Sequence, residues 1–248
     1  MRSIRKGYVL GLVFLLLGTV QAWGQSKPLI RFANEHWLTF ILFDQLEMGP
    51  SFEGRPLAWN MDSWAGKVYN RIWIRSEGEL RTDRREGEME FQALYSRLIS
   101  PYWDAQIGAR MDVAFNETET RQRFHLAVGF EGLAPYWFEL EPTLFLSQNG
   151  EISASLVASY DVFITQRLIL QPELETFVAV QEVPDWGIGK GLNWVTLSWR
   201  LRYEIRREFA PYIGYQWHRF MGQTADLVQQ EGESIRTSGF VFGIRVWY

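Results

Sequence analysis

The chain contains no cysteine and only three histidines in 248 residues. Without cysteine there is neither a disulfide framework nor a thiolate metal site, two common ways in which exported proteins are stabilised or hold metals. No apolar run after residue 24 approaches the ~18 residues that a membrane-spanning helix needs. These absences exclude a disulfide scaffold, a cysteine-ligated metal centre and a helical membrane protein.

Segment 1–24 has the features of a secretory signal peptide. Three basic residues open it, an apolar stretch over 9–20 follows, and Val20-Gln21-Ala22 offers a small-residue cleavage site. We place the cleavage at about residues 22–24. Its removal takes away three cations and no acid, so the net charge changes from −4 to −7. An acidity of this size argues against a nucleic-acid partner.

Aromatic side chains and short alternating runs are what the sequence has in abundance. Phe, Trp and Tyr make up 16% of the residues, and 12 of these are Trp. The clearest run flanks Asn149-Gly150, where apolar and polar residues alternate over about ten residues on each side. Such alternation around an Asn-Gly step predicts an antiparallel hairpin with one apolar and one polar face. Strands of about ten residues also match a tilted crossing of a lipid bilayer.

The same pattern recurs along the chain and predicts an all-β fold, a transmembrane antiparallel up-and-down β-barrel of about 12 strands. The even number of strands, with tight turns at one end and longer loops at the other, is typical of bacterial outer-membrane barrels. Residues 25–35 form a short N-terminal segment, 36–248 form the barrel, and the longest connection, 220–237, is expected to be a loop. The predicted strands cover about residues 36–47, 57–66, 70–80, 88–99, 103–114, 123–133, the two halves of the Asn149-Gly150 hairpin, 167–180, 193–204, 211–219 and 238–248.

Charged side chains of both signs occupy the polar face of these strands, which is expected to line the barrel lumen. One interpretation is a structural lattice of carboxylate–guanidinium pairs that fills a narrow barrel. The other is a polar conduit or an acidic site for cations, because charged walls select what passes. Both remain open at this point. The residues of this expected network are Glu77, Glu90, Asp104, Arg110, Asp112, Arg123, Glu131, Glu139, Glu141, Glu173, Glu175, Arg200, Arg202 and Arg245.

Four residues are candidate metal ligands. His125 and His218 fall on the polar face, where an imidazole can bind a soft or borderline metal, although a lumen histidine can equally be a hydrogen-bonded neighbour of a carboxylate. Met48 and Met221 lie in or near the longer connections, and thioethers suit monovalent copper. The competing interpretation of the methionines is apolar filling.

Several long segments carry a family resemblance. They read FQALYSRLISPYWDAQIGARMD, GLAPYWFELEPTLFLSQNGEISASL, DVFITQRLILQPELE, LRYEIRREFAPYIGYQW and, at the end, FVFGIRVWY. Together they closely resemble the copper resistance protein B family, over about residues 44–248. The resemblance implies an outer-membrane barrel of a Gram-negative bacterium that is involved in copper tolerance and in copper ion binding or passage. Copper ions, outer-membrane lipid and periplasmic copper-handling proteins are the partners that it implies.

The chain departs from the family in one respect. Many members carry an N-terminal extension rich in Met and His, whereas here His36 is the one histidine and no methionine lies between the signal peptide and the first predicted strand. The resemblance therefore implies a copper conduit or a low-capacity copper binder without a copper-gathering tail. The alternative is a structural or general small-solute barrel with a salt-bridged lumen and no copper role. A lipid hydrolase would need a Ser–His pair on the lipid face, and since His125 and His218 are expected in the lumen, we do not expect an enzyme.

Overall fold

The structure, a computed structural model, describes residues 36–49, 56–81, 86–230 and 232–248. Residues 37–248 form one compact unit. The predicted signal peptide and the segment 25–35 lie outside the described residues. Within the described ranges, no helix is both long enough and apolar enough to cross a membrane.

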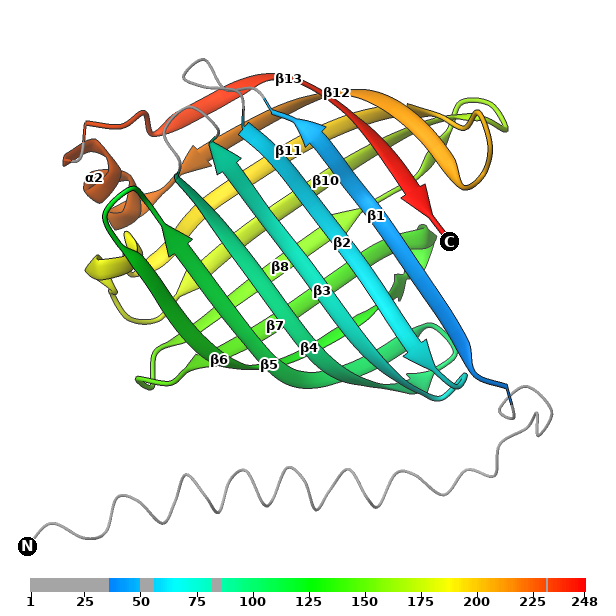
Figure 1. The fold of residues 1–248 in the computed structure, drawn as a ribbon, viewed down its shortest axis with the longest axis horizontal. Helices are drawn as coiled ribbons and strands as arrows, with labels where there is room; N and C mark the ends of the chain where they lie inside the picture. The colour runs from blue at the N-terminus through cyan, green and yellow to red at the C-terminus, as the bar shows by residue number, and fades with distance from the viewer. Residues whose placement is uncertain (1–35, 50–55, 82–85, 231) are drawn as a thin grey trace, which may run out of the picture. The chain divides into compact units, whose positions relative to one another are not determined.

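Thirteen strand segments form one antiparallel sheet that closes on itself, because β1 pairs with β13 (Figure 1). The short segments β8 and β9 both pair with β10 and share one place in the wall, so the barrel has twelve strands, as the sequence predicts. The segments are β1 Leu38–Met48, β2 Pro56–Gly66, β3 Asn70–Arg81, β4 Glu86–Ser100, β5 Trp103–Phe115, β6 Thr120–Ala134, β7 Phe138–Ser147, β8 Ile152–Ser159, β9 Val162–Phe163, β10 Leu168–Ala179, β11 Gly191–Tyr203, β12 Phe209–Phe220 and β13 Arg236–Trp247.

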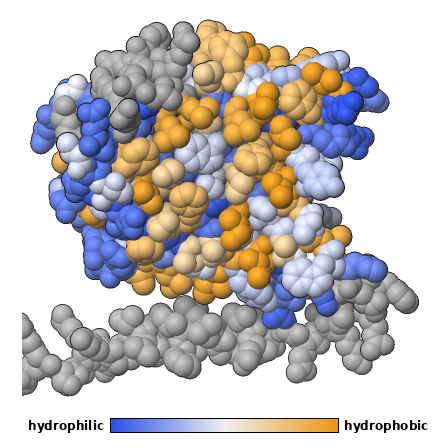
Figure 2. All heavy atoms as spheres, viewed as in Figure 1, coloured by the Kyte–Doolittle hydropathy of each residue, from blue (hydrophilic) through white to orange (hydrophobic). Residues whose placement is uncertain are grey.

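Alternation along each strand separates an apolar outside from a mostly polar inside. On β6, Phe124 is 47% exposed and Phe130 46%, whereas Arg123 is 4% exposed and His125 6%. Successive strand side chains point to opposite faces, so the exposed set covers the outside of the barrel. Figure 2 shows these apolar side chains spread over the visible face of the strands, with hydrophilic residues gathered toward two ends. An exterior of this kind is what a barrel surrounded by lipid requires.

The two ends of the barrel differ in their connections. At the short-turn end, tight connections follow β2, β4, β6, β9 and β11, and the β6–β7 connection contains the 3-10 turn η1 (Pro135–Trp137). At the long-loop end lie the connections after β5, β7, β10 and β12, and also the 3-10 turn η2 (Pro184–Trp186). Two described connections at the long-loop end, 180–190 and 221–235, are longer than any at the short-turn end, as the sequence predicts, whereas the connections after β5 and β7 have four residues each.

One prediction about the connections is wrong, because the 220–237 connection contains a helix. Helix α2 (Gly222–Gln230) has nine residues and contacts β11 and β12. A helix of this length is marginal by itself in water, and packing stabilises it. Here the buried side chains of Thr224 and Val228 provide that packing, which sequence periodicity over nine residues does not reveal.

The inward face of the barrel is not uniformly polar. This corrects the expectation that polar and charged side chains alone line the lumen. Trp73, Leu94, Phe145 and Phe177 are buried and belong to one apolar cluster, although each lies on the parity of the charged residues. The cluster follows the cross-strand rows of the wall, since Trp73 pairs with Leu94 and Ala127 with Phe145. A narrow lumen can thus be filled partly by packed apolar side chains.

Gly108 sits in this inward row between Leu94 and Ala127. A Cβ atom at Gly108 would lie 1.9 Å from the backbone oxygen of Ala93 and 2.7 Å from the Cα atom of Leu94. Backbone atoms cannot move aside as a flexible side chain can, so the close approach of β4 and β5 requires glycine here.

We predict that Gly108→Val lowers the folded fraction of the barrel at least several-fold, because β5 can no longer pair with β4 in register. The measurement is the heat-modifiable mobility of the refolded protein on a denaturing gel. Ala109→Val is the matched control, since Ala109 is exposed on the outer face and its larger side chain would only meet lipid. Equal folding of the two variants would contradict the requirement for glycine.

Candidate functional site

Arginine side chains cross the interior of the barrel and connect strands that are far apart in the wall. Arg75 of β3 contacts three carboxylates: Asp62 of β2 at 3.1 Å, Glu131 of β6 at 2.8 Å and Glu141 of β7 at 3.0 Å. Three strands separate β3 from β7, so the contact with Glu141 spans the lumen. We call Arg75 and these three carboxylates the Arg75 bridge. The guanidinium also lies 5.1 Å from the ring centre of Trp73, part of the inward apolar cluster.

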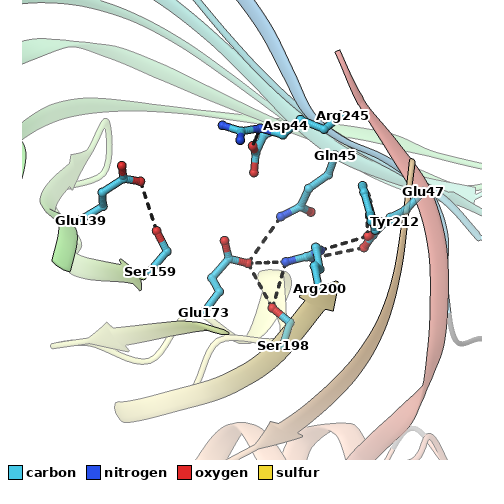
Figure 3. A network of polar contacts seen from close by, with 10 residues as sticks. All are labelled: Asp44, Gln45, Glu47, Glu139, Ser159, Glu173, Ser198, Arg200, Tyr212 and Arg245. Atoms are coloured by element: carbon cyan, nitrogen blue, oxygen red, sulfur yellow. Dashed lines mark hydrogen bonds and ion pairs between the residues drawn. The ribbon is translucent and has the colours of Figure 1, made fainter. Parts of the chain in front are cut away.

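A second group of ion pairs is buried more deeply and joins β1 to β10 and β11 across the interior (Figure 3). Arg200 of β11 contacts Glu47 of β1 at 3.2 Å and Glu173 of β10 at 2.6 Å. These three side chains are between 3% and 9% exposed. The Tyr212 hydroxyl donates to Glu47 over 2.8 Å, and Ser198 donates to Glu173 over 3.1 Å. We call Arg200, Glu47 and Glu173 the Arg200 bridge.

Arg71 and the remaining guanidiniums of the expected network, those of Arg110, Arg123, Arg202 and Arg245, are also paired. Arg110 contacts Glu90 at 2.7 Å and Asp112 at 2.6 Å, and Arg71 contacts Asp104 at 2.9 Å. The other pairs join Arg123 to Glu151 at 3.2 Å, Arg245 to Asp44 at 2.6 Å, and Arg202 to Asp161.

Glu139, Glu77 and Glu175 of the expected network form no ion pair with an arginine of the described residues. Glu139, near the short-turn end, accepts a hydrogen bond from Ser159 over 3.3 Å. Glu77 lies directly opposite Glu90 of the next strand, which in turn lies opposite Asp112. In the part of the chain that the structure describes, neither Glu77 nor Glu175 has a cationic side chain within 4.0 Å.

Carboxylates outnumber guanidinium groups in these clusters. Arg75 forms ion pairs with three carboxylates, and Arg110 and Arg200 form ion pairs with two carboxylates each. Like charges directly opposite each other, as at Glu77 and Glu90, are unfavourable unless a cation or a proton lies between them.

The two inward histidines lie on opposite sides of the barrel. On β6, His125 is 6% exposed; its Nε2 atom lies 3.0 Å from Asp112, and its ring meets Phe145 edge-on. On β12, His218 packs against Trp194 and Phe220. The Nδ1 atom of His218 lies 2.9 Å from the Thr196 hydroxyl. Among the described residues, no group of three His, Asp or Glu side chains is arranged to hold a metal ion.

The structure does not bring the candidate methionines to the histidines. Met48 ends β1, is 54% exposed, and lies on the outer side next to Glu47. Met221 connects β12 to α2, and its backbone N–H donates to the Asn193 carbonyl over 2.7 Å. Met61, Met89 and Met111 alternate with inward residues and also face outward. The strands of the described barrel thus direct carboxylates and imidazoles inward, while Met48, Met61, Met89 and Met111 face outward.

The β10–β11 connection folds over the lumen at the long-loop end. Its Ile188 packs against the inward apolar cluster, and Arg121 of β6 donates a hydrogen bond to the Asp185 carbonyl. The guanidinium of Arg123 lies 5.9 Å from the ring centre of Trp186. The connection therefore reaches back across β8 and β7 to β6, and it covers part of the lumen entrance.

Helix α2 supports this connection from the other side. The Thr224 hydroxyl accepts a hydrogen bond from the Gly189 N–H over 2.8 Å and donates one to the Asn193 side chain. The Gln223 side chain accepts from the Lys190 N–H over 2.9 Å. The glycine-rich loop and the helix thus form one cover, whose parts are about 35 residues apart in the sequence.

Sequence reasoning missed the acidic residues of the first two strands. Asp44, Glu47 and Asp62 all contribute to the bridges or to their surroundings. An irregularity of register between Phe43 and Gln45 shifts the alternation of β1 by one residue. Such a bulge places an extra residue on one strand, so a strict period of two does not identify Glu47 as inward.

Known proteins resemble this chain over most of its length. The family model described as Copper resistance protein B precursor matches residues 37–248. Copper resistance protein B of Escherichia coli is 42% identical over 208 residues, which are 84% of this chain and 69% of that protein. The Copper resistance protein B homolog of Pseudomonas syringae pv. tomato is 37% identical over 210 residues, 85% of this chain and 70% of that protein.

Two solved porin structures align with most of this chain at low sequence identity. A KdgM porin aligns with 85% of this chain and 98% of its own, at 10% identity and a TM-score of 0.46. The KdgM porin in complex with disordered oligogalacturonate aligns with 84% of this chain and 98% of its own, at 9% identity and a TM-score of 0.48.

We predict that Glu47→Ala lowers the free energy of unfolding by about 3 kcal/mol, since it leaves Arg200 and Tyr212 buried without their shared acceptor. Urea unfolding followed by tryptophan fluorescence, with the protein in lipid vesicles, measures the change. Glu86→Ala is the control, because the Arg81–Glu86 pair is about one-third exposed at the long-loop end and should contribute less than about 1 kcal/mol. Equal losses in the two variants would refute a special role of the Arg200 bridge.

Proposed function

We infer that this chain, which belongs to the copper resistance protein B family, is an outer-membrane barrel that binds copper ions in its lumen and lets them pass. In this role it supports copper tolerance of a Gram-negative bacterium. The observation that carries the proposal is the excess of inward carboxylates over the arginines that they share, most clearly at Arg75. A lumen with this charge attracts cations and repels anions.

The donor set of the lumen suits divalent copper. Carboxylate oxygens and imidazole nitrogens are good ligands for Cu²⁺, whereas thioethers favour Cu⁺. His125 beside Asp112 and His218 beneath the cover of the long-loop end are the two nitrogen ligands that we propose. Met48 and Met221 are the proposed thioether contacts outside the lumen, at the long-loop end.

A copper ion would pass through the lumen by replacing guanidinium groups, one after another, as the partner of the inward carboxylates. A cation that reaches Glu131 and Glu141 can take the place of the Arg75 guanidinium, whose charge then remains with Asp62. Transient binding of this kind is what conduction requires, since a site must be favourable enough to enter and weak enough to leave. We propose that periplasmic copper-handling proteins meet the ions at the short-turn end.

The Arg75 and Arg200 bridges also favour a second candidate function, a structural barrel whose lumen is closed by its ion pairs. Paired buried charges stabilise a conformation without transporting anything. The two functions differ in ion flux, which is directly measurable. A hydrolase finds no support, because the hydroxyl that contacts His218 belongs to Thr196, inside the barrel.

We predict that the refolded barrel in liposomes admits Cu²⁺ to a trapped copper-sensitive dye, and that Glu131→Gln/Glu141→Gln slows this influx about fivefold or more. The double substitution removes the negative charge that attracts cations while it preserves size. Glu119→Gln is the control, because Glu119 is 62% exposed in the β5–β6 connection. A wild-type protein that admits neither Cu²⁺ nor Na⁺ would instead establish the structural barrel.

We also predict that His125→Ala and His218→Ala each weaken Cu²⁺ binding several-fold and independently, because the two imidazoles lie on separate walls. Calorimetric titration of the refolded barrel measures the effect, with Met48→Leu and Met221→Leu tested in parallel against both Cu²⁺ and Cu⁺. Unchanged affinity in both histidine variants would remove His125 and His218 as ligands.

A further inference from the structure

Two arginines lie directly opposite each other on the outside of the barrel. Arg219 near the end of β12 pairs in register with Arg236 at the start of β13. Both side chains are exposed. They share the parity of Tyr215 and Phe240, which are 38% and 64% exposed on the outer face. Like charges in a directly opposed cross-strand pair are destabilising, so this pair needs an explanation.

Within the described ranges, neither arginine has a carboxylate partner. Over the described residues, no carboxylate oxygen lies within 4.0 Å of either guanidinium. The guanidinium of Arg236 lies 5.9 Å from the ring centre of Trp217, one pair further into the barrel wall. This cation–π contact holds Arg236 against the outer face and supplies no negative charge. The two strands therefore bring two exposed cations together without a described counter-charge.

The position of the pair along the strands indicates which anion it meets. From the middle of the wall outward, the cross-strand pairs are Ile213 with Phe242, Tyr215 with Phe240, Trp217 with Ser238, and Arg219 with Arg236. The order runs from aliphatic and aromatic to basic side chains, as at the edge of a membrane. A step of two residues along a strand tilted by ~40° rises about 5 Å toward the surface. Arg219 and Arg236 therefore lie just beyond the aromatic girdle, at the depth of lipid headgroups.

The pair belongs to the long-loop end, since β12 leads there into α2 (Figure 1). In outer-membrane barrels this end faces the outside, and the leaflet on that side consists of acylated glycolipids that carry phosphates. Guanidinium groups bind phosphate through paired, charge-assisted hydrogen bonds. A phosphate between the two strands would also relieve the repulsion of the two arginines.

We propose that Arg219 and Arg236 form a binding site for the phosphate of an outer-leaflet glycolipid, with Trp217 holding Arg236 in place. The site is separate from the lumen and from the copper chemistry, and it rests on the proposed function only through the outer-membrane location. A lipid bound there would connect β12 and β13 to the surrounding leaflet, beside the β10–β11 connection and helix α2, which cover part of the lumen entrance.

Native mass spectrometry of the refolded barrel in detergent, without copper, tests the site. The lipid probe is a bisphosphorylated lipid A, with the same lipid after removal of its phosphates as the comparison. We expect Arg219→Gln/Arg236→Gln to bind the phosphorylated probe about tenfold less than the wild-type protein does. Arg97→Gln is the matched control, because Arg97 is an exposed arginine on β4 near the short-turn end, and it should bind like the wild type.

Three results would overturn the proposal. The double variant and Arg97→Gln could retain the phosphorylated probe equally, removal of the phosphates could leave wild-type binding unchanged, or inorganic phosphate at the same concentration could displace the lipid. Phosphatidylglycerol binding as tightly as the glycolipid would overturn the assignment to the outer leaflet. Heat-modifiable gel mobility checks that each variant is folded, and the single variants Arg219→Gln and Arg236→Gln are measured if the double variant is not. A failed copper flux would leave these results unchanged.

Discussion

Hydrogen bonding of the backbone in lipid is the constraint on which the rest of this structure depends. A strand edge left open inside a bilayer would cost several kcal/mol for each unpaired group, so a sheet that spans a membrane has to close. The pairing of β1 with β13 satisfies this constraint. Closure also forces the charged face of every strand inward, where more than a dozen ionisable side chains share one narrow space.

Burying so many charged groups is unfavourable unless they are paired. Arg75 and Arg200 provide such pairs across the lumen, with carboxylates on strands that are not their neighbours. Arg75 connects β3 to β6 and β7, and Arg200 connects β11 to β1 and β10. Each of these two guanidiniums is shared by two or three carboxylates, so one cation holds together strands from separate parts of the wall. The same contacts therefore join strands that lie far apart in the wall, and among the described residues no group of three His, Asp or Glu side chains is arranged as a metal cage.

The two ends of the barrel differ in how they are covered and in which side chains they expose. At the long-loop end, α2 and the β10–β11 connection hold each other over the lumen through Thr224 and Gln223. On the outer face of the same end, Arg219 and Arg236 stand beyond the aromatic girdle. The short-turn end has no cover of this kind among its described connections, and exposed aromatic residues such as Tyr136 and Trp137 surround it.

The sequence by itself determined the type of fold, because the alternation of polar and apolar residues can be read within each strand without knowing which strands pair with it. The predicted range 103–114 differs from β5 by one residue, and 211–219 lies within β12. The inward parity of Arg200, Glu131, Glu141 and Glu173 was also readable from alternation. The shifted register at Phe43 and Gln45 hid Glu47, and a nine-residue helix stabilised by packing was too short to detect.

Only the tertiary structure decided which charges meet. Glu141 is 66 positions from Arg75 and Glu47 is 153 from Arg200, and nothing local connects such residues. Their partners follow from the order of the strands, the register of each pair and the tilt of the closed wall, which together set what lies across the lumen. The same holds for Arg219 and Arg236, whose opposition exists only because β12 and β13 pair in one particular register.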